Sequence, residues 1–167
     1  MGGLRGKRRL RRGRPPGGGG QAKVLSAPEI NRVDKCLSGT RTEIRDRALL
    51  YLQYATGMRA GELAALNVGD VFHRGKIRKE FRLGTDDTKY CRARTIFLEN
   101  PKAVAAVLAY LRRRKPDLGF AGNEPLFVGQ KLNHTTRSFR LSPNSMAHLF
   151  LTVADAARTD HHDAAGG

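Results

Sequence analysis

The chain has 167 residues, 40% of them apolar, which is enough for one ordinary domain with a buried core. Its net charge of +16, from 31 Lys and Arg against 15 Asp and Glu, favours a polyanionic partner, most often nucleic acid. No apolar run is long enough for a membrane span, no secretory signal follows the basic N-terminus, and two cysteines are too few for a disulfide framework or a zinc site. We therefore expect a cytoplasmic protein that binds neither membranes nor metal.

Residues 1–24 form a Gly-, Arg- and Pro-rich segment with almost nothing to bury. Residues 1–20 hold seven basic side chains and no acid, and removing those seven charges from +16 leaves +9 on the rest of the chain. Like charges repel and glycines add flexibility, so the composition predicts a disordered arm. An arm that wraps DNA phosphates and a segment without a selected role are equally compatible with this composition.

Two amphipathic helices and a short third one come next. Ser26 and Glu29 form a capping box, and apolar residues then recur at helical spacing. A second helix is predicted over residues 42–55, Gly57 ends it, and a short helix follows over residues 60–66. The residues expected to face the core are Ile30, Val33 and Leu37 in the first helix and Ile44, Ala48, Leu49 and Leu52 in the second.

A β-hairpin is predicted after these helices. Residues 67–70 are expected to form a turn. Charged and apolar residues then alternate over residues 76–83 and again over residues 92–98, with the polar loop 84–88 between them. Such alternation is typical of strands with one buried face, so the two runs predict an antiparallel hairpin.

Two further helices complete the predicted elements. Asn100 and Pro101 have the residue types of an N-cap and a first helical position. Residues 126–128 form a short strand or buried loop, residues 142–157 a final helix, and residues 158–167 an unstructured, divergent tail. The expected inner faces are Val104, Val107, Leu108 and Leu111 in the first of these helices and Met146, Leu149, Phe150 and Val153 in the second.

The segment from Ala55 to Leu66 carries the clearest chemical signal. Gly57 permits a sharp turn, so Arg59 is expected at the start of a new helix, beside backbone N–H groups that attract anions. Its guanidinium can hold two phosphate oxygens, and Glu62 can reach back to the helix start or to Arg59. From the residues alone, a surface arginine in a helix–turn–helix corner is the slightly better interpretation.

Two motifs resemble those of a known family. Lys89 lies five residues before Arg94, which leads the apolar run Thr95 to Leu98. These positions are similar to the hairpin lysine and the following strand of tyrosine recombinases, the phage integrase family. The element order agrees over about residues 23–157, which implies the N-terminal portion of that catalytic domain: mainly α with a small antiparallel β-hairpin (α+β), folded over residues 25–157. The box around the family's first catalytic arginine is matched at Thr56-Gly57-Met58-Arg59, Glu62-Leu63, Leu66 and Asp70-Val71.

The resemblance implies a chemistry and a set of site residues. In this family a tyrosine attacks the scissile phosphate of double-stranded DNA without metal or other cofactor, and arginines stabilise the charge on the phosphate. Arg59 would then clamp the phosphate, Glu62 would support it, and Lys89 would be the general acid. Arg59, Lys89, Arg92 and Arg94 are the implied DNA contacts, and self-association on the DNA is a further expectation.

The sequence departs from the family pattern after the last predicted helix. The family continues with a His-x-x-Arg box and then the tyrosine nucleophile, but here Ala165 stands three residues after His162. No nucleophile is assigned, and we expect a truncated or frameshifted integrase-like recombinase that contacts DNA without cleaving it. The alternatives are a non-catalytic DNA-binding module and a generic basic nucleic-acid-binding protein. The tyrosines, none of which is in the nucleophile's place, are Tyr51, Tyr54, Tyr90 and Tyr110.

The same departure affects the expected stability. In the family, later helices cover the final predicted helix. We therefore expect its apolar face, with Met146, Leu149 and Phe150, to lie exposed. The domain is then expected to be only marginally stable.

Overall fold

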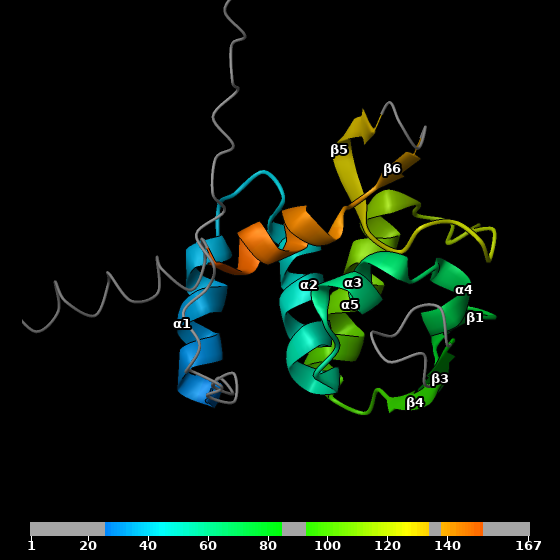
Figure 1. Cartoon of the computed structure of the whole chain (residues 1–167), viewed down its shortest axis with the longest axis horizontal. Coiled ribbons are helices and arrows are strands. Elements are labelled where there is room, and N and C mark those ends of the chain that lie inside the picture. The colour runs from blue at the N-terminus through cyan, green and yellow to red at the C-terminus, as the bar shows by residue number, and fades with distance from the viewer. Residues whose placement is uncertain (1–25, 85–92, 134–137, 152–167) are drawn as a thin grey trace, which may run out of the picture.

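The computed structural model describes residues 26–84, 93–133 and 138–151. Helices dominate it and the strands form three two-stranded antiparallel sheets, so the predicted α+β class is confirmed (Figure 1). None of the helices in these ranges is long and apolar enough to cross a bilayer. The elements are α1 (Ala27–Leu37), α2 (Glu43–Thr56), α3 (Ala60–Ala65), α4 (Val68–Val71), β1 (Phe72–His73), β2 (Lys76–Ile77), β3 (Glu80–Leu83), β4 (Arg94–Phe97), α5 (Pro101–Arg114), β5 (Val128–Asn133) and β6 (Ser138–Arg140), and residues 143–151 are also helical.

Short-range contacts set the ends of the longer helices. The Ser26 backbone N–H donates to Glu29 Oε2 at 2.8 Å, which is the predicted reach-back contact at the start of α1. Gly57 ends α2 in the left-handed conformation, with φ 63°. Asn100 Oδ1 accepts from the Lys102 backbone N–H at 3.0 Å at the start of α5. These boundaries follow from residues within one turn of the helix end, and the sequence predicts them to within a residue or two.

The main core lies between α2 and α5, which pack along each other. Leu49 and Leu52 of α2 and Val107 and Leu111 of α5 are fully buried in it. A second, smaller cluster lies between α1 and α2 on the other side of α2 (Figure 1). Its buried members are Ile30, Val33, Leu37 and Leu50.

One predicted core position of α2 is wrong. Ile44 is 40% exposed, whereas Leu50 and the carboxylate of Asp46 are buried. Asp46 accepts hydrogen bonds from Thr42 Oγ1 at 2.6 Å and from Arg45 Nε at 2.8 Å, which satisfy its buried oxygens. Because α2 contacts α1 as well as α5, its buried surface is not the single stripe that helical periodicity predicts.

The predicted hairpin is confirmed in its pairing. β3 and β4 are antiparallel, with Glu80 opposite Phe97 and Leu83 opposite Arg94. Alternate residues on the two strands face the main core, as the alternation in sequence predicts. The polar loop between the strands lies largely in residues 85–92, outside the described residues.

Several short elements differ from the prediction. β1 pairs with β2 around a two-residue turn, Arg74-Gly75, in which both residues have positive φ (47° and 81°). The strand predicted over residues 76–83 is therefore divided into β2 and β3. The predicted turn at residues 67–70 contains most of the short helix α4. β5 and β6 form a further hairpin that the sequence patterns do not indicate.

The helix at residues 143–151 packs against the main core. Met146 is fully buried, and Leu149 and Phe150 are partly buried in the same cluster. The expectation that this face lies exposed is therefore wrong, because the described elements already cover it. The rest of the predicted helix, the tail at residues 158–167 and the arm at residues 1–24 lie outside the described residues.

Candidate functional site

The arginine box forms a turn followed by the short helix α3. Met58 is 1% exposed and Leu63 is fully buried, so both ends of this segment are fixed in the main core. Arg59, between them, is the N-cap residue of α3, and its side chain is 54% exposed. The alternation of buried and exposed residues therefore places the guanidinium of Arg59 at the surface on a backbone that cannot shift easily.

Glu62 is the buried acid around which the site is built. It is 2% exposed, and its Oε2 accepts from the Arg59 backbone N–H at 2.9 Å while its Oε1 accepts from Arg59 Nη1 at 3.2 Å. The sequence predicts that Glu62 reaches either the helix start or Arg59, and both contacts are present. Glu62 Oε2 also accepts from Arg94 Nη2 of β4 at 2.6 Å. We call Arg59, Glu62 and Arg94 the arginine cluster.

Three of the five predicted site residues meet in this cluster. Arg94, the first residue of β4, is predicted as a DNA contact, and its 41% exposed side chain is paired with Glu62. Lys89 and Arg92 lie outside the described residues. The roles of all five in DNA contact or catalysis stay predictions.

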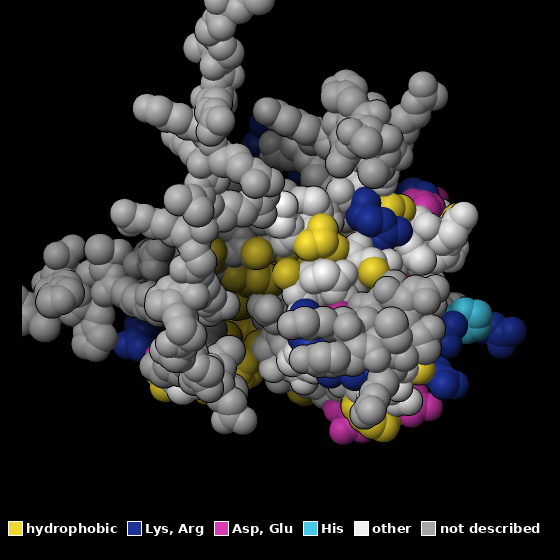
Figure 2. All heavy atoms as spheres, viewed as in Figure 1, with side chains coloured by type: hydrophobic (Ala, Val, Ile, Leu, Met, Phe, Trp, Pro, Cys, Tyr) yellow, Lys and Arg dark blue, Asp and Glu magenta, His cyan; other side chains and the backbone are white. Residues whose placement is uncertain are grey.

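Exposed basic side chains also lie on β2 and β3, in the turn before β2 and in the link between β2 and β3, and we call them the basic strip. In Figure 2 Lys and Arg side chains lie at the right of the molecule, where these strands lie in Figure 1. The alternation of charged and apolar residues predicts strands in this segment but not the β1–β2 turn, because Arg74-Gly75 lacks the Asn, Asp or Gly that commonly precedes Gly in such turns. The strip consists of Arg74, Lys76, Arg78, Lys79 and Arg82, with Glu80 as the exposed acid among them.

Arg140 of β6 holds the C-terminal end of α3 and is not predicted from the sequence. Its Nη1 donates to the backbone oxygens of Ala64, Ala65 and Leu66 at 2.8, 2.9 and 2.9 Å, and its Nη2 donates to Asn67 Oδ1 at 2.6 Å. The last carbonyls of a helix have no N–H donor within the helix, and here the guanidinium donates to them. The partners are 73 to 76 residues away in sequence, and no local pattern links them.

Arg140→Ala should lower the free energy of unfolding by about 1–2 kcal/mol, because it removes charge-assisted hydrogen bonds to three carbonyls at the end of α3. Arg113→Ala removes the same charge from an exposed position on α5 and should change that free energy by less than about 0.5 kcal/mol. Chemical denaturation of both variants measures the difference. Equal losses would contradict a capping role for Arg140.

Tyr51 of α2 and Tyr110 of α5 are placed as structural side chains, whereas Tyr54 of α2 is 38% exposed. Tyr110 is 5% exposed, its ring stacks on Phe127 with the centroids 5.6 Å apart, and its hydroxyl accepts from the Val128 N–H at 3.2 Å. Burial raises the pKa of Tyr110, which opposes the ionisation that a nucleophile needs. Burial also raises the pKa of Tyr51, which packs between the two core clusters.

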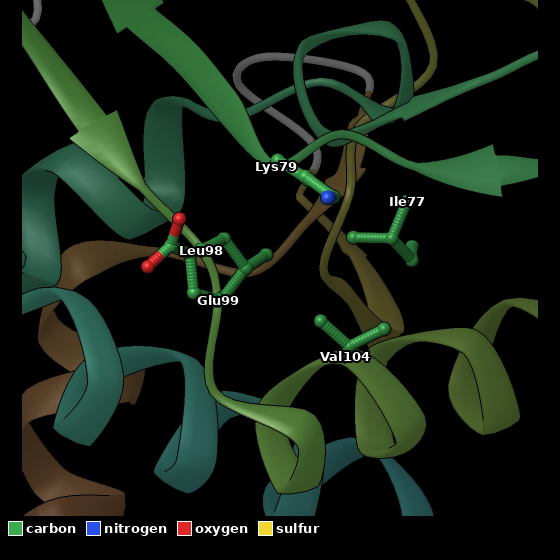
Figure 3. A pocket seen from close by; sticks show the side chains of 5 residues that line it. All are labelled: Ile77, Lys79, Leu98, Glu99 and Val104. Atoms are coloured by element: carbon green, nitrogen blue, oxygen red, sulfur yellow. The ribbon is translucent and has the colours of Figure 1, made fainter.

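A pocket of about 290 Å³ lies between β2, the link after β4 and α5. In Figure 3 Ile77, Leu98 and Val104 form its aliphatic walls, together with Lys79 and Glu99. It shares no residue with the arginine cluster. Within the described ranges, no three His, Cys, Asp or Glu side chains are grouped as metal ligands would be.

Several known proteins similar to this chain are tyrosine recombinases. Over 48 residues it is 42% identical to tyrosine recombinase XerD of Oceanobacillus iheyensis, a match that covers 29% of this chain and 16% of the relative. Over 137 residues it is 29% identical to tyrosine recombinase XerC of Myxococcus xanthus, covering 81% and 40%. Tyrosine recombinase XerD of Neisseria meningitidis serogroup A is 29% identical over 147 residues, covering 78% and 45%. The chain thus spans less than half the length of these relatives.

The fold and the family agree with these similarities. The crystal structure of XerA recombinase matches with a TM-score of 0.59 at 22% identity, over 86% of this chain and 45% of that one. The model of the phage integrase family matches residues 23–164, a range that contains the arginine cluster, the β3–β4 hairpin and the helix at residues 143–151. The chain therefore belongs to the phage integrase family.

Proposed function

We propose that the chain binds double-stranded DNA, that Arg59 contacts a backbone phosphate, and that these 167 residues by themselves do not cleave the strand. The observation that carries the proposal is the arginine cluster, in which one buried carboxylate fixes two guanidinium groups that are 54% and 41% exposed. A guanidinium is planar and always charged, and its paired N–H groups match two phosphate oxygens. The cluster lies at the arginine box by which the chain resembles the family.

The charge outside the cluster supports a long polyanion rather than a small anion. The basic strip places five exposed cations within nine consecutive residues, and the whole chain carries +16. Duplex DNA offers phosphates at regular intervals, so a row of cations can each neutralise one of them. In this proposal Lys89 and Arg92, which lie between β3 and β4 in the sequence, add further phosphate contacts. Self-association on the DNA and a cytoplasmic location belong to the same proposal.

The absence of cleavage is proposed from the residues that would perform it. The family's reaction needs a tyrosine nucleophile, and the printed sequence has no tyrosine after Tyr110. Tyr110 itself is buried and its pKa is raised. Arg59 and Lys89 can stabilise charge and donate a proton, but neither replaces the attacking hydroxyl.

Arg59→Ala should weaken binding of a labelled duplex about tenfold and lower the slope of log affinity against log salt by about one, since it removes one phosphate contact. Lys89→Ala should act in the same direction. The matched control is Arg113→Ala, which removes an exposed arginine on α5 and should weaken binding by no more than about twofold. Fluorescence anisotropy at several salt concentrations measures both quantities.

Three results would contradict this proposal. Equal losses in Arg59→Ala and Arg113→Ala would mean that the basic surface binds without a specific site. Equal affinity for duplex DNA and duplex RNA would favour a generic nucleic-acid-binding protein. A covalent protein–DNA adduct, on a denaturing gel after incubation with a nicked duplex, would show that the chain does cleave.

A further inference from the structure

We propose that Arg94 is a positioning residue for the phosphate contact of Arg59. It neutralises the buried carboxylate of Glu62, so that the positive charge of Arg59 acts on the DNA instead of on Glu62. The inference rests on the proposed DNA contact of Arg59. In it, Arg94 acts through the cluster and needs no contact of its own with the nucleic acid.

Arg94 makes a shorter side-chain hydrogen bond to the Glu62 carboxylate than Arg59 does. Arg94 Nη2 is 2.6 Å from Oε2, whereas Arg59 Nη1 is 3.2 Å from Oε1. The charge-assisted contact from Arg94 is therefore the short one, and that from the Arg59 side chain is the long one. Arg59 contributes its backbone N–H to Glu62 at 2.9 Å, which ties the start of α3 to the acid without using the guanidinium.

The charges of the cluster explain why it matters which of the two arginines neutralises Glu62. Two guanidinium groups and one carboxylate leave one net positive charge at the surface. Glu62 is 2% exposed, and a buried carboxylate without a cationic partner is costly. If Arg94 were removed, Arg59 would be the cation in contact with Glu62, and the pair would be neutral. A DNA phosphate would then have to compete with Glu62 for the same guanidinium.

Arg94 also connects two parts of the chain that the proposed function uses together. It is the first residue of β4 and lies opposite Leu83, which is 2% exposed and ends β3. Lys89 belongs to the segment of sequence that connects these two strands. The ion pair between Arg94 and Glu62 therefore joins β4, the strand that follows this segment, to α3.

The experiment compares the effect of Glu62→Gln in two backgrounds. Gln keeps an oxygen that can accept from the Arg59 backbone N–H but removes the negative charge. Arg94→Ala should weaken duplex binding about tenfold and lower the salt slope by about one, as loss of one phosphate contact does. Adding Glu62→Gln to Arg94→Ala should restore affinity to within about twofold of the unmodified chain, because the charge of Glu62 then no longer competes with the phosphate for Arg59.

The control background is Arg82→Ala, which removes an exposed cation from β3 that is not part of the cluster. There, Glu62→Gln should raise affinity by no more than about twofold, the effect expected from one extra charge at the surface. Arg94→Lys, which keeps the charge, should stay within about threefold of the unmodified chain. Thermal melting of each variant identifies any that is unfolded at the assay temperature.

The outcomes separate this inference from the proposed function. If Arg59→Ala weakens binding but Glu62→Gln does not restore the Arg94→Ala variant, Arg94 contacts DNA itself or only holds the fold, and this inference alone fails. A purely structural link predicts further loss in the double variant, because a second cluster contact is removed. If Arg59→Ala has no more effect than Arg113→Ala, both the proposed function and this inference are overturned.

Discussion

Replacing Leu52 with alanine should lower the free energy of unfolding by about 2–5 kcal/mol. Leu52 is fully buried on α2 and belongs to the main core with Val107 and Leu111 of α5. The substitution removes apolar contact area and leaves a cavity, which the packed helices cannot fill without moving. Urea denaturation, monitored by far-ultraviolet circular dichroism, measures the loss. A loss of this size would mean that the main core accounts for a large share of the domain's free energy of unfolding.

The matched control is Ile44→Ala on the same helix. Ile44 is 40% exposed, so its replacement removes little buried area and should cost less than about 1 kcal/mol. The control also tests the correction to the predicted inner face of α2, because helical periodicity groups Ile44 with Leu52. A loss at Ile44 as large as that at Leu52 would mean that Ile44 is buried in the folded protein.

Helix ends were predictable because their causes are local. Ser26 with Glu29, Gly57, and Asn100 each act on backbone groups within one turn, so the sequence contains both partners side by side. The buried face of α2 was not predictable in full, because it depends on two neighbours at different angles. Leu50 is buried only because α1 lies over it, and no periodicity within α2 contains that information.

In the candidate site too, local contacts were predictable from the sequence and long-range contacts were not. Glu62 lies three residues after Arg59, the N-cap residue of α3, and their contact follows from the geometry of a helix start. Arg94 is 32 residues from Glu62, and the resemblance alone suggested that it matters, as a DNA contact rather than as a partner of the acid. Arg140 contacts the end of α3 across more than 70 residues, and neither periodicity nor resemblance indicated it. Contacts of this kind appear only once the hairpins β3–β4 and β5–β6 are placed against α3.

Replacing Gly69 with alanine should cost about 2–3 kcal/mol of unfolding free energy. Gly69 lies in α4, and a Cβ there would be 2.8 Å from the backbone oxygen of Gly122 and 2.9 Å from its Cα. Both obstacles are backbone atoms, so relief requires one of the two segments to move. The movement would strain the Gly69 N–H hydrogen bond to Gly122 O, now 2.9 Å, and the neighbouring Val68 N–H bond to Glu124 O, now 2.7 Å.

Gly122→Ala tests the same contact from the opposite side. A Cβ on Gly122 would have Gly69 Cα as its nearest obstacle at 3.9 Å, an ordinary van der Waals distance, so this change should cost less than about 1 kcal/mol. Comparable losses in both variants would contradict the asymmetry of the contact. The displaced segment follows directly on Leu66, whose carbonyl accepts from Arg140. Gly69→Ala should therefore also reduce the stability lost on Arg140→Ala, since the two changes act on one connected set of contacts and their effects should not add.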